Sequence, residues 1–442
     1  MVTYKNKDIL KITFPVLFSM LVEQLLTITD NAFLGRLSEI ELGASAIGGV
    51  FSIFLFMASF GFALGSQIII GRRNGEGNYK QIGNIFYQGI YFQVVLAVFV
   101  ILFTLFCVPW ILAHILSSEQ ICSAAVNYLS WRTLGFVFAG IGVMYRSLFM
   151  GTVQTKVLMP ASVVMVVSNC LFNYILIFGK FGFPQLGITG AAIGTSLAEL
   201  MQLGYYAVYT KRRIQTAKYG LNIIPHVDFS VLRQIWNLSV WTMIQNVCSV
   251  GTWFMFYLFI EHLGEKEIAV TNIIRGMNGL IFVSYTSFAS TCCTLVSNLL
   301  GMNKADEVMP TIRRHILLAY LLVTPLILLY IAFPHAMLSV FTNIEELKVM
   351  GAPVMWDLLV INIIGIAQSI LFESIAGTGN TKKVLQIEIF SLVVYTLYIW
   401  YVIYYLKSSL VISWTADAVY NFIILVLSVL YFRYANWKDK KI

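Results

Sequence analysis

Charged residues are scarce in this chain. Of its 442 residues only 11% are Asp, Glu, Lys or Arg, and 59% are hydrophobic, whereas soluble globular domains carry about 25% charged residues. The mean hydropathy is +0.80. A chain of this length would ordinarily suggest about three soluble domains. The composition overrides that expectation and predicts a polytopic membrane protein whose main solvent is lipid.

Motifs of enzymes and metal sites are also missing. The six cysteines lie mostly in apolar segments without zinc-type CxxC pairs, so we interpret them as packing residues. The sequence contains no HExxH, GxSxG or GxxxxGK[ST] motif, which argues against an enzyme and an ATP-driven pump. We therefore expect no enzymatic activity and no cofactor. The apolar run after the basic N-terminus is too long for a signal peptide and predicts a membrane helix.

What the chain has instead is a series of apolar segments, each long enough for a membrane helix, which needs about 20 residues. Twelve such segments run over residues 9–34, 44–70, 83–112, 123–150, 157–179, 186–210, 232–262, 268–300, 312–340, 347–376, 383–406 and 410–432. We therefore expect twelve transmembrane helices.

The basic residues between these segments are unevenly distributed. Of the 29 Lys and Arg residues, 21 lie on the side of the N-terminus, 5 on the opposite side, and 3 (Arg132, Arg146 and Arg275) within or near spans. Because cytoplasmic loops carry the excess of Lys and Arg, we expect both termini in the cytoplasm. As a separate expectation, we place the chain in the inner membrane of a prokaryote. The net charge of +8 then reflects anchoring beside anionic lipid and not nucleic-acid binding.

Three short stretches of the first half recur in the second half at a constant offset of 226 positions. Residues 37–47 (LSEIELGASAI) resemble residues 263–273 (LGEKEIAVTNI), Gly75 corresponds to Gly301, and residues 151–156 (GTVQTK) resemble residues 377–382 (GTGNTK). Since six helices return the chain to the side on which it started, the two halves are expected to be parallel repeats.

This repeat predicts an all-α membrane protein in two six-helix lobes. We expect an N-lobe at residues 1–209, a charged cytoplasmic linker at 210–234 and a C-lobe at 235–442. Two similar lobes suit alternating access around a substrate site near the membrane midplane. The alternative is a scaffold that transports nothing. It would not explain why the chain keeps polar residues inside its spans, where they cost free energy.

Polar side chains lie within several apolar segments of the first half. They are the triplet Glu23, Thr27 and Asp30 on one helix face, and the pairs Asn169 with Asn173 and Thr195 with Glu199, each one turn apart. A charged group in hydrocarbon costs about 3 kcal/mol, so such residues usually line a cavity or contact a partner. A solvated Asp30 near the membrane surface, and asparagines that only join helices, are the simpler alternatives.

Several stretches together resemble the MATE (multidrug and toxic compound extrusion) transporters. They are TDNAFLGRLSEIELGASAI (29–47), SQIIIGRRNGEGNYKQI (66–82), MPASVVMVVSNCLFNYILIFG (159–179), LGITGAAIGTSLAE (186–199) and GTGNTKKV (377–384). The resemblance spans nearly the whole chain. It implies a V-shaped, two-lobed antiporter that exports organic, often cationic, compounds in exchange for Na⁺ or H⁺. We expect small organic substrates and membrane lipids as partners, no nucleic acid, and a monomer.

The resemblance also implies a cation site in the N-lobe. The family's Asp, Asn, Asp and Thr ligands correspond here to Asp30, Asn169, Asn173 and Thr195, whose oxygens suit a hard cation such as Na⁺. Asn173 departs from the pattern and removes one negative charge, which Glu199 is placed to restore. For proton coupling, a cationic substrate would compete with the proton for the Asp30 carboxylate. Apart from Na⁺ at this site we expect no metal.

The second half lacks the mid-helix acids that another branch of the family uses. Residues 241–260 contain no acid, and Phe256 takes the place of Asp30 at the offset of the repeat. Asp357 and Glu373 lie near the two ends of the segment 347–376. Glu388 and Asp417 are secondary candidates, or they simply pair with a nearby Lys or Arg.

The alternative function is that of a flippase for a lipid-linked saccharide or a related amphiphile from the same superfamily. A flippase predicts a strongly cationic cavity with several intramembrane Arg or Lys residues. Only three arginines qualify here, which favours the drug antiporter.

Overall fold

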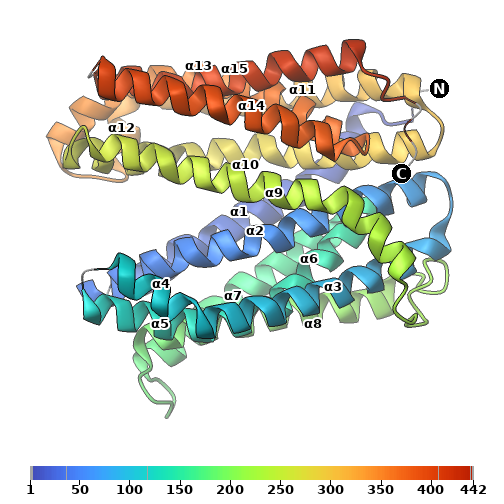
Figure 1. The fold of residues 1–442 in the computed structure, drawn as a ribbon, viewed down its shortest axis with the longest axis horizontal. Helices are drawn as coiled ribbons and strands as arrows, with labels where there is room; N and C mark the ends of the chain where they lie inside the picture. The colour runs from blue at the N-terminus through green and yellow to red at the C-terminus, as the bar shows by residue number, and fades with distance from the viewer. Residues whose placement is uncertain (1–2, 36, 117, 407, 439, 441–442) are drawn as a thin grey trace. The chain divides into compact units, whose positions relative to one another are not determined.

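A computed structural model describes residues 3–35, 37–116, 118–406, 408–438 and 440. These residues form helices, turns and loops, and no strand (Figure 1). The expected all-α membrane fold is therefore confirmed.

The first half of the chain contains α1 to α8. Their bounds are α1 (Asn6–Leu34), α2 (Glu39–Gly75), α3 (Tyr79–Phe106), α4 (Val108–Ile115), α5 (Glu119–Leu134), α6 (Phe136–Gly151), the 3₁₀ turn Thr155–Val157, α7 (Leu158–Phe178) and α8 (Gly187–Arg213).

The second half contains α9 to α15. Their bounds are α9 (Phe229–Glu261), α10 (Glu265–Gly301), the 3₁₀ turn Ala305–Glu307, α11 (Val308–Ala332), α12 (Pro334–Ser339), α13 (Glu345–Gly377), α14 (Thr381–Trp400), the π-helical turn Tyr401–Tyr405 and α15 (Leu410–Tyr434).

All twelve expected spans coincide with helices. Among the described residues, ten helices are long and apolar enough to cross a membrane, and eleven if α5 and α6, bent by 47° at their junction, form one span. The remaining expected span, 186–210, is α8, which is 27 residues long but less apolar. Two expected spans, 83–112 and 312–340, are each interrupted and form α3 with α4 and α11 with α12.

Two compact units make up the chain. The N-terminal unit comprises Phe14–Met243, and the C-terminal unit comprises Met1–Thr13 together with Ile244–Ile442. The start of α1 thus belongs with the second half of the chain: the Thr13 hydroxyl lies 3.0 Å from that of Thr291. The division runs within α1 and α9.

The segment expected to be a linker is packed onto α3 within the N-terminal unit. Tyr87 and Tyr91 donate hydrogen bonds of 2.8 Å to the carbonyl oxygens of Leu221 and Pro225. The Gln88 amide donates to the carbonyl of His226 at 2.7 Å and accepts from the backbone N–H of residue 228 at 3.0 Å. These bonds pair backbone carbonyl and N–H groups of the loop that would otherwise have to bond to water.

The backbone repeats the offset found in the sequence. Helices α2 and α10 have 37 residues each, and their first and last residues are 226 positions apart. Two turns with left-handed backbone follow the same offset, Gly77 with Asn303 and Val153 with Gly379. The repeat seen in the sequence therefore extends to the ends of helices and to the conformation of the turns between them.

Close contacts between helices depend on glycines four residues apart. On α8, a Cβ at Gly190 would lie 2.6 Å from the carbonyl oxygen of Leu176 on α7. On α2, a Cβ at Gly61 would lie 2.6 Å from the Cα of Met243, and one at Gly65 would lie 2.8 Å from the Cα of residue 239. Small residues at this spacing let membrane helices approach closely, so that packing replaces the hydrophobic driving force that lipid does not supply.

Candidate functional site

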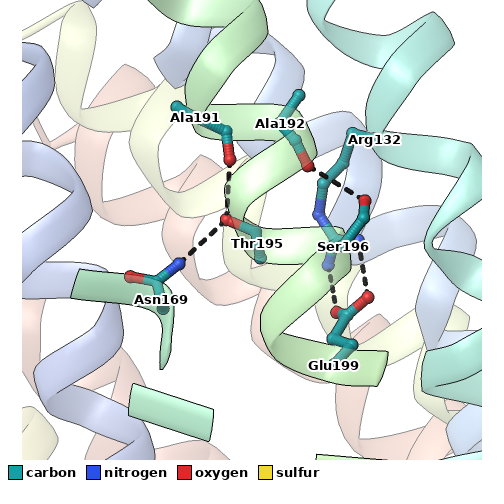
Figure 2. Close-up of polar contacts among 7 residues, drawn as sticks. All are labelled: Arg132, Asn169, Ala191, Ala192, Thr195, Ser196 and Glu199. Carbon is teal, nitrogen blue, oxygen red and sulfur yellow. Dashed lines mark hydrogen bonds and ion pairs between the residues drawn. The ribbon is translucent and has the colours of Figure 1, made fainter. Parts of the chain in front are cut away.

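A chain of hydrogen bonds joins α1, α7 and α8 in the N-terminal unit. The Asn173 amide donates to Asp30 Oδ1 at 2.6 Å and to Asn169 Oδ1 at 3.1 Å. The Asn169 amide donates to the Thr195 hydroxyl at 3.1 Å, which donates to the carbonyl of Ala191 at 3.0 Å (Figure 2). The structure therefore brings together all four residues at which the sequence predicts a cation site. We call these four residues the Asp30 cluster.

The Asp30 cluster is shielded from solvent on the side of α7. Asn169 and Asn173 are fully buried, Thr195 is 7% exposed and Asp30 is half-buried. Asn173 Oδ1 is a buried oxygen without a hydrogen-bond donor among the described residues. Buried polar atoms are nearly always satisfied, so this oxygen is a place where a cation would gain a ligand.

The glycines of α8 explain how the cluster closes. A Cβ at Gly194 would lie 3.3 Å from the backbone nitrogen of Asn173 and 3.4 Å from its Cγ. With Gly190 one turn earlier, the bare face of α8 lets α7 come near enough for an Asn side chain to reach a Thr hydroxyl. The sequence pattern GAAIG at residues 190–194 carries this signal, because small residues four apart mark close helix crossings.

Glu23 lies in a separate cluster further along the same two helices. Its carboxylate accepts hydrogen bonds from Ser162 at 2.7 Å and Ser19 at 3.2 Å, and it forms an ion pair with Arg146 at 3.2 Å. Glu23 and Asp30 therefore both face α7, as their spacing on α1 predicts. The side chain of Thr27, the third member of that expected stripe, lies outside the described residues.

Glu199 is held by Arg132. The guanidinium forms two hydrogen bonds to the carboxylate, at 2.6 and 3.1 Å, and the two side chains are only 14% and 12% exposed (Figure 2). Both charges interact electrostatically with Asp30. Glu199 is the acid that the sequence offers as a replacement for the charge lost at Asn173, and in the structure its carboxylate pairs with Arg132.

The bend between α5 and α6 positions this ion pair. Gly135 lies at the junction, where a Cβ would come within 2.8 Å of the Ser196 Cβ and 2.9 Å of a Glu199 carboxylate oxygen. Arg132 lies just before the bend, on the last turn of α5. A glycine is required here because any side chain would push the carboxylate away from its arginine.

A cavity of about 190 Å³ lies in the same unit. Its lining includes both acids of the two ion pairs, Glu23 and Glu199, together with Arg146, Gln202 and Tyr206. Aromatic and apolar side chains, among them Phe56 and Phe60, form much of the remaining wall. A mostly apolar lining with few convergent polar groups is usual for a small-molecule site, but the volume is below the range of about 300–1,000 Å³ that is typical of such sites.

The C-terminal unit has an ion pair of its own. Arg275 lies 3.5 Å from Asp417, whose other oxygen accepts a hydrogen bond of 2.9 Å from Tyr395. Glu388 is 1% exposed and accepts hydrogen bonds from Tyr420, at 2.8 Å, and from Ser249. Of the two secondary candidates, Asp417 therefore pairs with an arginine, and Glu388 is bound by hydroxyl groups.

All three intramembrane arginines are thus paired with acids of the same unit, Arg132 with Glu199, Arg146 with Glu23 and Arg275 with Asp417. The sequence indicates that such arginines need partners, because an unpaired charge in lipid is costly. It does not indicate which acid each arginine meets, since the paired residues are 67 to 142 positions apart. Asp30 differs from the other three acids in that its hydrogen bond comes from a neutral amide.

This fold and these clusters define an integral, multi-pass membrane protein with charged and polar groups built into its spans, as in membrane transporters. The chain belongs to the MatE family, whose model matches residues 15–175 and again residues 242–402. Two matches of equal length, one in each half of the chain, agree with the internal repeat. The predicted family is confirmed, and with it the expectation that the chain is not an enzyme.

Similar sequences carry names from drug resistance. The probable multidrug resistance protein NorM of Thermotoga maritima is 25% identical, covering 99% of this chain and 94% of its own. The NorM of Streptococcus pneumoniae strain R6 is 34% identical over 302 residues, which cover 67% of this chain and 66% of its own. The probable multidrug resistance protein YoeA of Bacillus subtilis is 24% identical, in an alignment that covers 97% of this chain and 93% of YoeA.

Solved structures share the fold. An outward-facing multidrug resistance MATE family transporter superposes with a TM-score of 0.90 at 16% identity, over 98% of this chain and 97% of its own. A transporter of the MOP superfamily from Pyrococcus furiosus superposes with a TM-score of 0.89 at 17% identity, over the same shares. The two-lobed transporter fold predicted from the sequence is therefore confirmed.

Proposed function

We propose that the protein is a secondary active multidrug efflux antiporter, which exports small organic, often cationic, compounds in exchange for Na⁺ or H⁺. The names of its relatives support drug export. The observation that carries the exchange mechanism is the Asp30 cluster, in which a carboxylate within a membrane span is bound by an amide and not by a basic side chain. Such a carboxylate has a negative charge to offer to a passing cation.

Competition for this single charge supplies the exchange. A proton, a sodium ion or a cationic substrate can each neutralise Asp30, and neutralising it once removes the attraction for the others. For Na⁺, the oxygens of Asp30, Asn169, Asn173 and Thr195 form a mixed carboxylate, amide and hydroxyl set of the kind that hard cations accept. No further cofactor or metal is proposed.

The setting we propose is the inner membrane of a prokaryote, with both termini in the cytoplasm, membrane lipids around a monomer, and no nucleic-acid partner. The distribution of Lys and Arg supports the orientation. Transport through alternating access between two repeated halves supports a single chain as the working unit.

Replacing Asp30 by Asn tests this function. We expect gradient-driven export of an organic cation from liposomes by the wild type under an imposed Na⁺ or H⁺ gradient, and a loss of about tenfold or more in the variant, because the amide has no charge to exchange. Glu346→Gln is the matched control, since that acid lies in an exposed ion pair with Lys266. Unchanged transport by Asp30→Asn would remove Asp30 from the mechanism.

The flippase is the second candidate. It requires a surplus of positive charge in a cavity, and the described part of each unit instead has its intramembrane arginines neutralised by acids. Gradient-independent movement of a lipid-linked saccharide, without export of organic cations, would favour it.

A further inference from the structure

The C-terminal unit contains a cavity that the proposed exchange at Asp30 does not use. Its volume is about 320 Å³, at the lower end of the range of about 300–1,000 Å³ that is typical of ligand sites. It lies among α9, α10, α13, α14 and α15. The residues that line it and enter the argument are Ser249, Arg275, Tyr395, Trp414, Asp417, Tyr420 and Asn421.

This cavity occupies the place that corresponds to the Asp30 cluster in the internal repeat. The residues 226 positions after Asp30, Asn169 and Thr195 are Phe256, Tyr395 and Asn421. Tyr395 and Asn421 line the cavity, and Phe256 packs against its arginine. In the N-terminal unit Thr195 donates to the carbonyl of Ala191, and the residue 226 positions after Ala191 is Asp417. The acid has thus moved from the first helix of the repeat to the last.

The Arg275 guanidinium lies where a bound organic cation would be expected to lie. Its guanidinium lies 4.5 Å from the ring centroid of Phe256 and 5.2 Å from that of Trp414, beside the Asp417 carboxylate at 3.5 Å. Aromatic faces around a cation, closed by a carboxylate, are the arrangement that recognises quaternary ammonium ligands. The distance to Asp417 is longer than the 2.6 and 3.2 Å of the other two intramembrane pairs, so this ion pair is the loosest of the three.

A second acid lies behind the wall of the cavity. Glu388 lies behind the wall and accepts hydrogen bonds from Ser249 and Tyr420, both of which line the cavity. No Lys or Arg among the described residues pairs with Glu388. The wall of the cavity itself thus holds one arginine and one carboxylate, Arg275 and Asp417. A ligand with one positive charge that takes the place of the guanidinium beside Asp417 keeps this balance.

We propose that this cavity is a second ligand site, for a small aromatic monocation such as a pyridinium or aryl ammonium compound, and that the ligand displaces Arg275 from Asp417. The ligand takes the place of the guanidinium between the rings, with Asp417 as its counter-charge and Asn421 and Tyr395 at its polar edge. The inference rests on the proposed function only in taking an organic cation as its ligand, because it concerns equilibrium binding and needs no ion gradient.

Binding of N-methylphenylpyridinium and of the uncharged phenylpyridine to the purified full-length protein tests this inference. Asp417→Asn should lower the affinity for the cation about tenfold, because the carboxylate loses its charge. Arg275→Met should raise the affinity by a similar factor, because the carboxylate loses the arginine that competes with the ligand. Binding of the uncharged compound should change little in either variant. Arg275→Lys keeps the competing charge and should bind like the wild type, and Lys266→Gln, in an exposed pair of the same unit, is the control.

Each outcome separates the inference from the proposed function. Equal binding of the cation by the wild type, Asp417→Asn and Arg275→Met would overturn the second site, as would the absence of binding by the wild type. Arg275→Met could instead lose binding of the cation, and the double variant Arg275→Met with Asp417→Asn could show the same loss. That result would make the arginine a structural support and would likewise overturn the displacement. Loss of gradient-driven transport in Asp30→Asn, measured alongside, depends only on the exchange site of the N-terminal unit.

Discussion

Asn173 decides the character of the Asp30 cluster at the scale of single residues. Two carboxylates at this distance would repel each other unless a proton or a metal ion lay between them. The amide instead donates directly to Asp30 at 2.6 Å, so no ion is needed to hold the two side chains together, and one carboxylate gives the cluster at most a single negative charge. A cation at such a site would be bound more weakly, and released more easily, than at a site with two acids.

Replacing Asn173 by Asp should therefore change the ion dependence of transport. We expect the variant to bind Na⁺ at least about tenfold more tightly, because a second carboxylate adds charge and oxygen ligands to the same set. Isothermal titration with Na⁺ and transport at several Na⁺ concentrations measure the change. Asn362→Asp, which alters an amide hydrogen-bonded to Asn278 in the C-terminal unit, is the control. An unaltered Na⁺ affinity in Asn173→Asp would show that Na⁺ does not enter the cluster.

Helix approach decides the geometry at the scale of elements. The Asp30 cluster closes because Gly190 and Gly194 leave α8 without side chains where α7 crosses it. The bend at Gly135 likewise brings Arg132 against Glu199. Both polar contacts thus depend on a neighbouring glycine, so the packing motif and the functional residues form one unit.

Gly190→Ala should destabilise the protein by about 1–3 kcal/mol, because a methyl group would be forced into the backbone of α7. Gly204 lies on the same helix, and a methyl group there would meet nothing within 4 Å, so Gly204→Ala is a matched control and should have no such effect. Thermal unfolding in detergent measures both. We further expect Gly190→Ala to impair transport, since the contact between Asn169 and Thr195 would widen. Equal stability of the two variants would contradict the role assigned to this crossing.

Two repeated halves with divergent interiors characterise the whole molecule. Helix lengths and turn conformations recur at the same offset along the chain, yet the polar residues do not: one unit has an acid on α1 and amides on α7, and the other has aromatic rings and an acid on α15. Different interiors within the same scaffold permit different ligands in the two units.

The orientation of the molecule can be tested at the two ends of α7. Lys156 and Lys180 are exposed and flank this helix. In a background in which the six cysteines are replaced, we expect a membrane-impermeant maleimide added outside intact cells to label Lys180→Cys and not Lys156→Cys, because the excess of basic residues lies in the cytoplasm. The opposite labelling would invert the predicted topology.

The sequence by itself determined the class of protein, the helical spans and the repeat. These follow from local or periodic properties, namely the run of apolar residues and the spacing of basic loops and motifs. Spacing also identified polar residues one turn apart on single helices, whereas the resemblance to the family was needed to combine Asp30, Asn169, Asn173 and Thr195 into one predicted site. The scarcity of charge was itself informative, because every charge left in a span needs a reason to be there.

Only the tertiary structure decided which charges meet. The spacing of Glu199 placed it one turn from Thr195 on the same helix, but its pairing with Arg132 depends on the bend at Gly135 and on how α5 lies against α8. The pairing of Arg275 with Asp417 and the cavity beside it likewise arise from helices far apart in the chain. Electrostatic partners are selected by distance in space, and sequence spacing fixes that distance only within one helix.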